Sequence, residues 1–493
     1  MVEILFRLGE VLDPGVNSRV LALAQHLRRA PFARTVVSGY AHVLLQAQSV
    51  PLAQVLAWAK EAPQSWHSGS YREVPVRYDG VDLANVAAQT GLSEARLVEL
   101  HSRPLYRAFA LGFAPGFPYL GQVVPELRLP RLAAPRPVVA GSVAIAGEQT
   151  GIYTVNSPGG WHILGTALVR IYDPAREDPF GIHPGDTVRF VPALGAAPAP
   201  FSRLELLEAG LGLLVEQAGL LDLVVDHCRL GGPSFGLAEG GPLDRASARV
   251  ANALLANPPE SPLLEINQAG PVLTAQIPLV VGYAGAGFVP LVNGQSFPGQ
   301  TSLALAKGDR LSFAPTGRGA RGYLSLPGGI ASRKFWGSAG VDLRAGIGRA
   351  LVAGDILSPA RPRPLRPGFS RSAWPKPAWI RITAGIDATP EGLRALIQGR
   401  FRVEAADRVG IRLAGAAVPG GERLSLPTTL GTIQVPPGGN PIILLADRGS
   451  LGGYWQLAKV HPQDLSYLGQ LTVGERVRFR LVGQPQLVID WPP

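Results

Sequence analysis

Two stretches of the chain, "SPGGWHILG" (Ser157–Gly165) and "SLGGYWQLA" (Ser450–Ala458), place a Gly-Gly pair and an aromatic residue before an apolar run. A Gly-Gly step lets backbone N–H groups approach a ligand closely, because no Cβ stands in the way. In the first stretch Trp161 can stack on a ligand, and His162 offers a titratable donor. Residues of these types at this spacing predict a site for a small ligand.

The second stretch is accompanied by more charge than the first. Asp447 precedes it and Lys459 follows it, while "ADRVGIRL" upstream adds Arg408 and Arg412. These two arginines share a strand face only if no bulge intervenes. Arginine binds two oxygens of a carboxylate or phosphate at once, which favours an anionic ligand.

The segment "YRAFALGFAPGFPYLG" (Tyr106–Gly121) gathers aromatic residues between Gly and Pro. Phe113, Phe117 and Tyr119 either line a pocket or form an aromatic corner that plugs the end of a barrel. The residues alone leave both interpretations open.

Two arginines follow this segment directly after prolines. Pro130-Arg131 and Pro135-Arg136 each hold a guanidinium on a stiffened backbone. They are either ligands for an anion or solvated surface residues.

Several chemistries lack their motifs. There is no Gly-x-x-x-x-Gly-Lys-Ser/Thr phosphate loop, no His-Glu-x-x-His and no Cys-x-x-Cys. No two serines are adjacent, which argues against a Ser-Ser-Lys amidase, and Met1 is the only Met, so a biotin attachment site of the Ala-Met-Lys-Met kind is absent. Cys228 is predicted to be plain core. No metal site is predicted.

Bulk properties indicate a globular protein of several domains. The chain has 493 residues, 46% of them hydrophobic and 17% charged, and a formal net charge of +10. Its arginines are scattered singly along the sequence, which does not favour nucleic-acid binding. One Cys gives no intrachain disulfide, and scarce Met and Cys fit a thermophile. No signal peptide or membrane span is predicted, so we expect a cytoplasmic protein.

The first eighty residues alternate between strand and helix patterns and predict a small α+β domain. Asn17 is the expected cap of the first helix. The expected strands and helices lie at 2–9, 17–30, 33–46, 51–62 and 71–78.

From Leu105 onward the helical period nearly vanishes. Three segments end on the same pattern: Gly, an acidic residue, any residue, Val or Leu, any residue and Phe. It occurs in "PGDTVRF", "KGDRLSF" and "VGERVRF", which we call the first, second and third closing phrases. Alternation behind the turn puts the aliphatic residue and the Phe on one sheet face. Three copies predict repeated barrel-like domains. The charge-free stretch 266–306 is expected to be buried strands, and 193–203 and 358–379 are expected linkers.

These motifs together resemble a known pair of families. "GFAPGFPYLG", "GSVAIAGEQTGIY" and "SPGGWHILG" are similar to the KipI family, once labelled allophanate hydrolase subunit 1. "GGPLDRASARVANALLAN", "GTIQVPPGGNPIILLADRGSLGGY" and "GERVRF" are similar to the KipA family, labelled subunit 2. The chain looks like a fusion of the two.

The resemblance implies a mainly β fold with an α+β, ferredoxin-like N-terminal domain followed by cyclophilin-like β-barrels. The expected boundaries are 1–82 for the ferredoxin-like domain, 83–200 for the KipI barrel, 201–365 for the first KipA domain, also expected to be a β-barrel, and 366–493 for the last cyclophilin-like barrel.

Carried over by motif, the resemblance also implies ligand-binding positions, although it implies no catalytic residue. These positions are His101, Phe117, Tyr119, Arg136, Ser142, Gln149, Ser157, Gly159, Gly160, Trp161, His162, Arg408, Arg412, Gln434, Asp447, Gly452, Gly453, Tyr454 and Lys459.

Members of this pair are the B and C subunits of an ATP-dependent 5-oxoprolinase, which opens 5-oxoproline to glutamate. The resemblance therefore implies a hydrolase subunit that needs a separate lactam-utilisation (A) subunit, with ATP and Mg²⁺ in the complete complex. The alternative is a regulator that binds a sensor histidine kinase. A third hypothesis, autonomous allophanate hydrolysis, lacks the paired serines.

Overall fold

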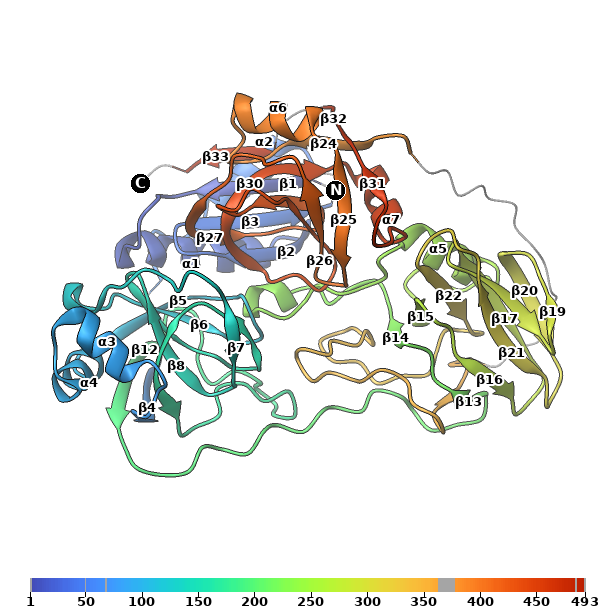
Figure 1. Ribbon diagram of the computed structural model, residues 1–493, viewed down its shortest axis with the longest axis horizontal. Coiled ribbons are helices and arrows are strands. Elements are labelled where there is room, and N and C mark those ends of the chain that lie inside the picture. Colours follow the sequence, from blue (N-terminus) through green and yellow to red (C-terminus); the bar gives the residue numbers. More distant parts are fainter. Residues whose placement is uncertain (1, 49, 67–68, 362–376, 484–485, 492–493) are drawn as a thin grey trace.

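The computed structural model describes residues 2–48, 50–66, 69–361, 377–483 and 486–491. Figure 1 shows an upper lobe that contains both the N-terminal sheet and the C-terminal barrel, and two lower lobes that contain the middle of the chain. The mainly β architecture with barrels that the sequence predicts is confirmed.

The N-terminal domain is a four-stranded sheet in the order β2-β3-β1-β33, covered by two helices. β3 lies between β1 and β2, as in the split βαβ unit of ferredoxin-like folds. The fourth strand comes from the other end of the chain and runs parallel to β1, with Ile4 opposite Leu487 and Arg7 opposite Asp490. The elements are β1 Val2–Arg7, α1 Pro14–Arg28, β2 Ala33–Ser38, β3 His42–Ala47, α2 Leu52–Lys60 and β33 Leu487–Asp490.

Two local expectations for this domain were wrong. The strand expected at 71–78 forms as β4 (Tyr71–Arg77), but it pairs with β12 in the neighbouring barrel, because Val74 and Val76 fill the core of that barrel. Helix α1 is capped by Asp13, whose carboxylate accepts the N–H of Val16 at 2.7 Å. Asn17 lies inside the helix and its amide donates to the carbonyl of Tyr40 at 3.1 Å.

The lower left lobe is a closed barrel in the order β11-β4-β12-β5-β6-β9-β8. The first closing phrase forms β12, and its Val188 and Phe190 are both buried in the barrel core as predicted. The elements are β4, α3 Leu83–Thr90, α4 Glu94–Ser102, β5 Tyr106–Leu111, β6 Pro118–Gly121, η1 Pro125–Leu127, β7 Arg136–Val138, β8 Ser142–Ala146, β9 Gln149–Ile152, β10 Ser157–Gly159, β11 His162–Ala167 and β12 Thr187–Pro192.

The lower right lobe consists of two sheets around one core. The charge-free stretch 266–306 supplies strands β16 to β20 and the end of β15, as predicted, and Leu311 and Phe313 of the second closing phrase are buried. The elements are β13 Leu213–Gln217, β14 Leu221–Val225, η2 Gly232–Phe235, α5 Arg245–Ala253, β15 Leu263–Asn267, β16 Val272–Ala275, β17 Leu279–Gly285, β18 Phe288–Val292, β19 Gln295–Ser296, β20 Gln300–Leu305, β21 Arg310–Pro315, β22 Arg321–Ser325 and β23 Ile356–Leu357.

The C-terminal barrel is one sheet in the order β31-β25-β26-β29-β28-β30-β24-β32, with β27 paired to β30. Val477 and Phe479 of the third closing phrase are buried inside it. The elements are β24 Ile380–Ala384, α6 Pro390–Gln398, β25 Phe401–Ala406, β26 Gly410–Gly415, β27 Glu422–Pro427, β28 Thr432–Val435, β29 Ile442–Leu444, β30 Leu451–Val460, η3 Pro462–Asp464, α7 Leu465–Leu468, β31 Arg476–Val477 and β32 Phe479–Leu481.

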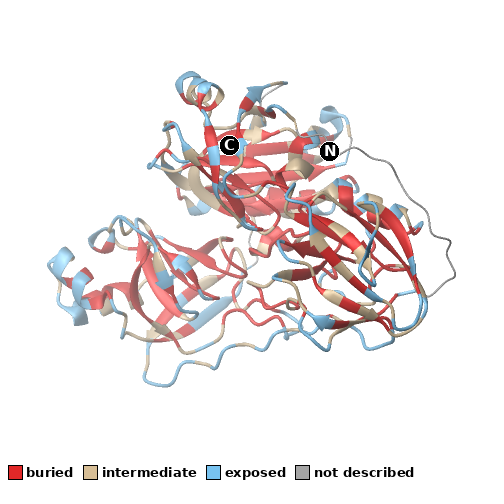
Figure 2. Cartoon of the chain, turned by 45° about the vertical axis from the view of Figure 1, so that its right-hand side comes forward, coloured by how far each residue is buried: buried red, intermediate tan, exposed pale blue. Residues whose placement is uncertain are grey.

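The lobes are joined by buried segments as well as by linkers. Figure 2 shows buried residues in the loops between the lobes, not only inside each lobe. The expected linker 193–203 has no strand or helix, and most of the expected linker 358–379 lies outside the described residues. None of the described helices is long and apolar enough to cross a membrane.

Candidate functional site

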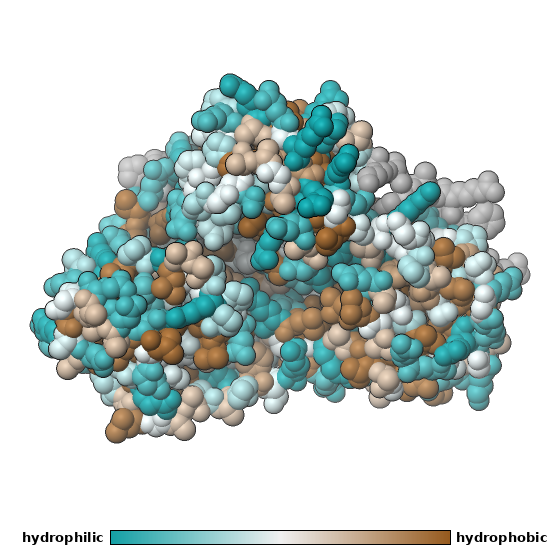
Figure 3. Space-filling view, in the orientation of Figure 1, coloured by the Kyte–Doolittle hydropathy of each residue, from teal (hydrophilic) through white to brown (hydrophobic). Residues whose placement is uncertain are grey.

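The four domains of the molecule meet in one apolar cluster. It contains Tyr40 of the N-terminal domain, Tyr119 and Trp161 of the first barrel, Ile347 of the two-sheet domain and Leu451 of the last barrel. Figure 3 shows the molecule hollowed where the upper lobe meets the two lower lobes. Both halves of the sequence therefore contribute to one junction.

The aromatic segment of the first barrel forms the floor of this junction. The ring of Phe117 lies 4.9 Å from that of Tyr119 and 5.5 Å from that of Trp161, in edge-to-face geometry. Phe113 packs against Phe117 at 5.4 Å, and Tyr40 approaches Tyr119 at 5.5 Å. The aromatic residues thus pack into a barrel end, and Tyr119 is turned toward the N-terminal domain.

The first Gly-Gly corner holds Arg131 in place. The N–H of Leu132 donates to the carbonyl of Gly160 at 2.8 Å, and the ring of His162 contacts the carbonyl of Pro130 at 2.9 Å. A Cβ on Gly159 would overlap the hydroxyl group of Tyr153, so only glycine fits there. The corner thus straps the segment around Arg131 to the barrel.

The second Gly-Gly corner faces the same guanidinium. A Cβ built on Gly453 would lie 3.3 Å from both terminal nitrogens of Arg131. A Cβ on the adjacent Gly452 would meet the side-chain amide of Gln434. The two corners, almost 300 positions apart in the sequence, therefore face one space.

A second arginine enters this space from the two-sheet domain. The guanidinium of Arg344 lies 4.9 Å from the ring centre of Phe113. Burial lowers the pKa of Arg344, and the nearby Asp342 opposes that shift. Among the described residues, neither Arg131 nor Arg344 is within salt-bridge distance of a carboxylate. The site therefore presents two cations that no described carboxylate contacts directly, although the charge of Asp342 acts on Arg344 from farther away.

Buried polar side chains lie near the two arginines. Tyr40 Oη, Gln149 Nε2, Ser157 Oγ and Gln434 Nε2 make no hydrogen bond of good geometry, although Gln149 and Ser425 lie close enough to Tyr40 to act against the rise in its pKa. Buried polar groups are normally paired, so a cluster of unpaired ones needs a water or a ligand. We call Tyr40, Tyr119, Arg131, Gln149, Arg344 and Gln434 the central site.

The two tyrosines of the central site are held neutral by their surroundings. Burial raises the pKa of Tyr40, and the neighbouring Tyr119 raises it further. Burial also raises the pKa of Tyr119, while the charges of Arg131 and Arg344 act in the opposite direction. Both hydroxyls therefore remain hydrogen-bond donors at neutral pH.

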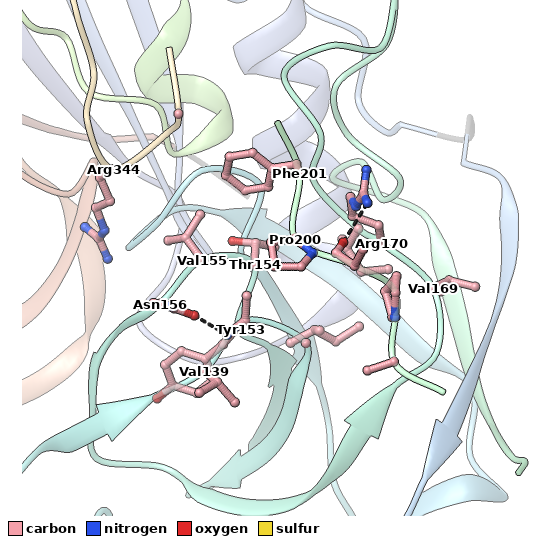
Figure 4. A pocket seen from close by; sticks show the side chains of 18 of the residues that line it. Val139, Tyr153, Thr154, Val155, Asn156, Val169, Arg170, Pro200, Phe201 and Arg344 are labelled. Atoms are coloured by element: carbon pink, nitrogen blue, oxygen red, sulfur yellow. Dashed lines mark hydrogen bonds between the residues drawn. The ribbon is translucent and has the colours of Figure 1, made fainter. Parts of the chain in front are cut away.

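A cavity of about 550 Å³ lies beside the central site. Figure 4 shows Phe201 above Val155 and Thr154, Tyr153 below them, and Arg344 at the left end of the lining. Residues 197–201 of the expected linker form part of the lining. Arg344 lines this cavity, and its charge also acts on Tyr119 of the central site.

Several implied ligand positions are engaged in structural contacts. Both ring nitrogens of His101 are used, one by Tyr78 and one by Thr150, each at 2.8 Å, and burial lowers its pKa to about 3. Arg136 makes an ion pair with Asp82. Ser142 is buried in β8, where its carbonyl accepts the N–H of Tyr153.

The charged positions of the second half do not converge on the central site either. Arg408 is buried and bound to Asp447, with Nε 2.7 Å from the carboxylate, and to Glu265. Lys459 makes an ion pair with Glu3. Arg412 is exposed on β26, so it does not share a ligand with Arg408.

Tyr454 is half-buried in β30, opposite Glu422. The structure thus gathers a subset of the implied positions around the junction, namely Phe117, Tyr119, Gln149, Ser157, Gly159, Gly160, Trp161, His162, Gln434, Gly452 and Gly453.

Tyr40 and Arg344 carry no signal in the sequence. Each lies in an ordinary loop and reaches the site only through packing between domains. Arg131 did carry a signal, the preceding proline, although the family motif did not include it.

Comparison with known proteins gives two family matches. Residues 235–481 match the model described as "Carboxyltransferase domain, subdomain A and B", and residues 2–182 match "Carboxyltransferase domain, subdomain C and D". A solved structure titled TTHA0988 is 48% identical, covers 97% of this chain and 99% of its own, and superposes with a TM-score of 0.93.

Two 5-oxoprolinase subunits each match one part of this chain. The B subunit of the 5-oxoprolinase of Escherichia coli O157:H7 is 42% identical over 37% of this chain and 89% of the relative. The C subunit of the 5-oxoprolinase of Haemophilus influenzae is 29% identical over 52% of this chain and 87% of the relative.

Proposed function

Because the chain belongs to the carboxyltransferase domain family and carries both its A/B and C/D subdomain pairs, we propose that it is a fusion of the B and C subunits of an ATP-dependent 5-oxoprolinase. The fused chain works with a separate A subunit to convert 5-oxoproline to glutamate. The relatives support this proposal, since a B subunit aligns with 37% of this chain and a C subunit with 52% of it.

The observation that carries the proposal is the pair of arginines without carboxylate partners at the junction of the two halves. 5-Oxoproline offers one carboxylate and one lactam amide. Arg131 matches the carboxylate, because a guanidinium donates two parallel hydrogen bonds to it. The amides of Gln149 and Gln434 and the hydroxyl of Tyr40 match the lactam N–H and C=O.

The chemistry of the lactam suggests what Arg344, the second arginine, does. Amide resonance protects the carbonyl carbon from water, so the reaction needs stabilisation of negative charge on the lactam oxygen. Arg344 lies near Tyr119 in a largely buried position, where a fixed positive charge acts strongly. The site therefore binds and polarises the lactam.

The nucleotide is not assigned to this chain. The described residues include no group of three His, Cys, Asp or Glu side chains that could hold a magnesium ion, and the sequence has no phosphate-loop motif. No step through ATP is therefore derived from these residues.

Reconstitution tests the proposal. The purified chain alone should release no glutamate from 5-oxoproline, and addition of the separate A subunit with ATP and Mg²⁺ should produce glutamate. Failure of the complete mixture to form glutamate would contradict the proposal. Ammonia release from allophanate by the chain alone would support autonomous hydrolysis instead.

The kinase-regulator alternative has no support from the relatives named above, which are enzyme subunits. A pull-down that returns a histidine kinase and no A subunit would favour it.

A further inference from the structure

The outer face of the C-terminal barrel carries a groove lined by arginines. It has a volume of about 420 Å³ and lies over β25, β26 and β31, with Arg400, Arg402, Arg476 and Arg478 along it. Single arginines scattered in the sequence are brought together here by strand pairing. The groove is on other strands of the sheet than Gln434 (β28) and Gly453 (β30) of the site described above.

The pairing sets two like charges against each other. Arg402 of β25 stands directly opposite Arg476 of β31 in the antiparallel register. Like charges at directly opposed positions destabilise a sheet. Among the described residues, none of the four groove arginines lies within 4.0 Å of a carboxylate. The fold thus tolerates a repulsion that a bound anion would relieve.

Apolar side chains adjoin the arginines. The guanidinium of Arg478 lies 5.5 Å from the ring centre of Trp379, and Trp379 is 43% exposed. Val473, the first residue of the third closing phrase, and Leu481, two residues after it, are also exposed. Figure 3 shows strongly hydrophilic side chains beside apolar ones over the right side of the upper lobe.

We propose that this arginine groove binds an acidic protein surface, that of the separate A subunit. This inference rests on the proposed function for its choice of partner. Arginine and tryptophan are the residue types enriched in protein interfaces, and they often dominate the binding energy. The groove is open and its Arg402 and Arg476 are exposed, which suits a macromolecular surface, whereas the arginines of the central site are less exposed.

Charge reversal tests the groove in the full-length chain. The double variant Arg402→Glu/Arg476→Glu should bind the purified A subunit at least tenfold more weakly at low salt. Raising NaCl should weaken wild-type binding and affect the variant little, because salt screens exposed charges. The neutral pair Arg402→Gln/Arg476→Gln should fall between wild type and the charge-reversed variant.

Matched controls separate docking from folding. Arg249→Glu reverses an exposed arginine on α5 in the two-sheet domain and should leave the dissociation constant unchanged. Unfolding midpoints measured for all variants identify any that misfold, and the neutral pair then remains as the test.

The outcomes distinguish this inference from the proposed function. Unchanged affinity of both double variants, or no binding of the A subunit by the wild-type chain, would overturn the inference. If the double variants lose binding to polyphosphate or RNA but bind the A subunit normally, the inference is also overturned, in favour of a surface for nucleic acid or phosphate. Groove-dependent binding without glutamate formation would leave the inference standing and refute the proposed function.

Discussion

The buried arginine Arg408 is predicted to hold two domains together rather than to bind a ligand. Its guanidinium contacts Asp447 at 2.7 and 3.0 Å, the carbonyl of Gly241 at 2.9 Å, and Glu265 of the two-sheet domain. Burial acts to lower the pKa of Arg408, but the two carboxylates outweigh burial and raise it. Arg408→Ala would leave Glu265 and Asp447 buried with too little positive charge.

The expected cost follows from that uncompensated charge. Breaking a buried ion pair by removing one partner destabilises a protein by about 3–5 kcal/mol. Arg321 also faces Glu265, at 3.9 Å, and compensates part of the loss, so we expect about 3 kcal/mol. The cost should shrink toward pH 4, because the stranded carboxylates can then take up protons.

Two measurements test this effect. Urea unfolding monitored by tryptophan fluorescence gives the loss of stability, and limited proteolysis shows whether the two domains separate. Arg412→Ala is the matched control, since that arginine is exposed on the adjacent strand and should leave the midpoint unchanged. An Arg408→Ala protein with wild-type stability but a raised KM for 5-oxoproline would refute the reasoning and restore Arg408 as a ligand-binding residue.

Two further predictions concern other parts of the molecule. Burial raises the pKa of Asp222 to about 7, whereas the pKa of an unfolded Asp is near 4. The protonated carboxyl should therefore contribute stability that is fully present below about pH 4 and is lost as pH rises through 7. Asp222→Asn should therefore flatten the fall in melting temperature between pH 4 and 7, and an equally steep fall in the variant would contradict the assignment. The ring of Trp491 packs edge-on against Phe6 at 5.3 Å. Trp491→Ala should therefore destabilise the N-terminal sheet by about 1–3 kcal/mol and speed its proteolysis. Leu487→Ala, on the same terminal segment, should have a smaller effect. A wild-type proteolysis rate for Trp491→Ala would show that this terminal segment does not stabilise the sheet.

Local patterns in the sequence predicted the strands well. The closing phrases placed Val188 and Phe190, Leu311 and Phe313, and Val477 and Phe479 in their barrel and sheet cores, because alternation and a Gly-acid turn are local properties. The burial of Cys228 was also predicted correctly.

The sequence could not predict which strands pair when they lie far apart in the chain. Nothing near Leu487–Asp490 indicates that this strand would complete a sheet that begins at Val2, more than 480 residues earlier. For the same reason β4 was assigned to the wrong domain, since its alternation fits either sheet. The opposition of Arg402 and Arg476 likewise depends on a register that only the folded barrel defines.

The candidate site could be predicted in part. Gly-Gly corners and aromatic residues carry chemistry in their types and spacing, so Trp161, Tyr119 and Gly453 were found. Tyr40 and Arg344 reach the candidate site only because four domains pack together there, and no local pattern encodes that arrangement. Buried charges such as Arg408 resembled ligand-binding residues until their partners were visible.

The most direct test of the account is the KM for 5-oxoproline of the reconstituted complex that contains Arg131→Ala. Loss of a charge-assisted hydrogen bond to the substrate carboxylate costs about 1.5–3 kcal/mol, which corresponds to a rise in KM of about 10- to 100-fold. Arg128→Ala, which removes a neighbouring arginine bound to Glu148, should leave KM unchanged. Equal KM values for the wild-type and Arg131→Ala complexes would contradict the claim that the two Gly-Gly corners enclose the lactam site.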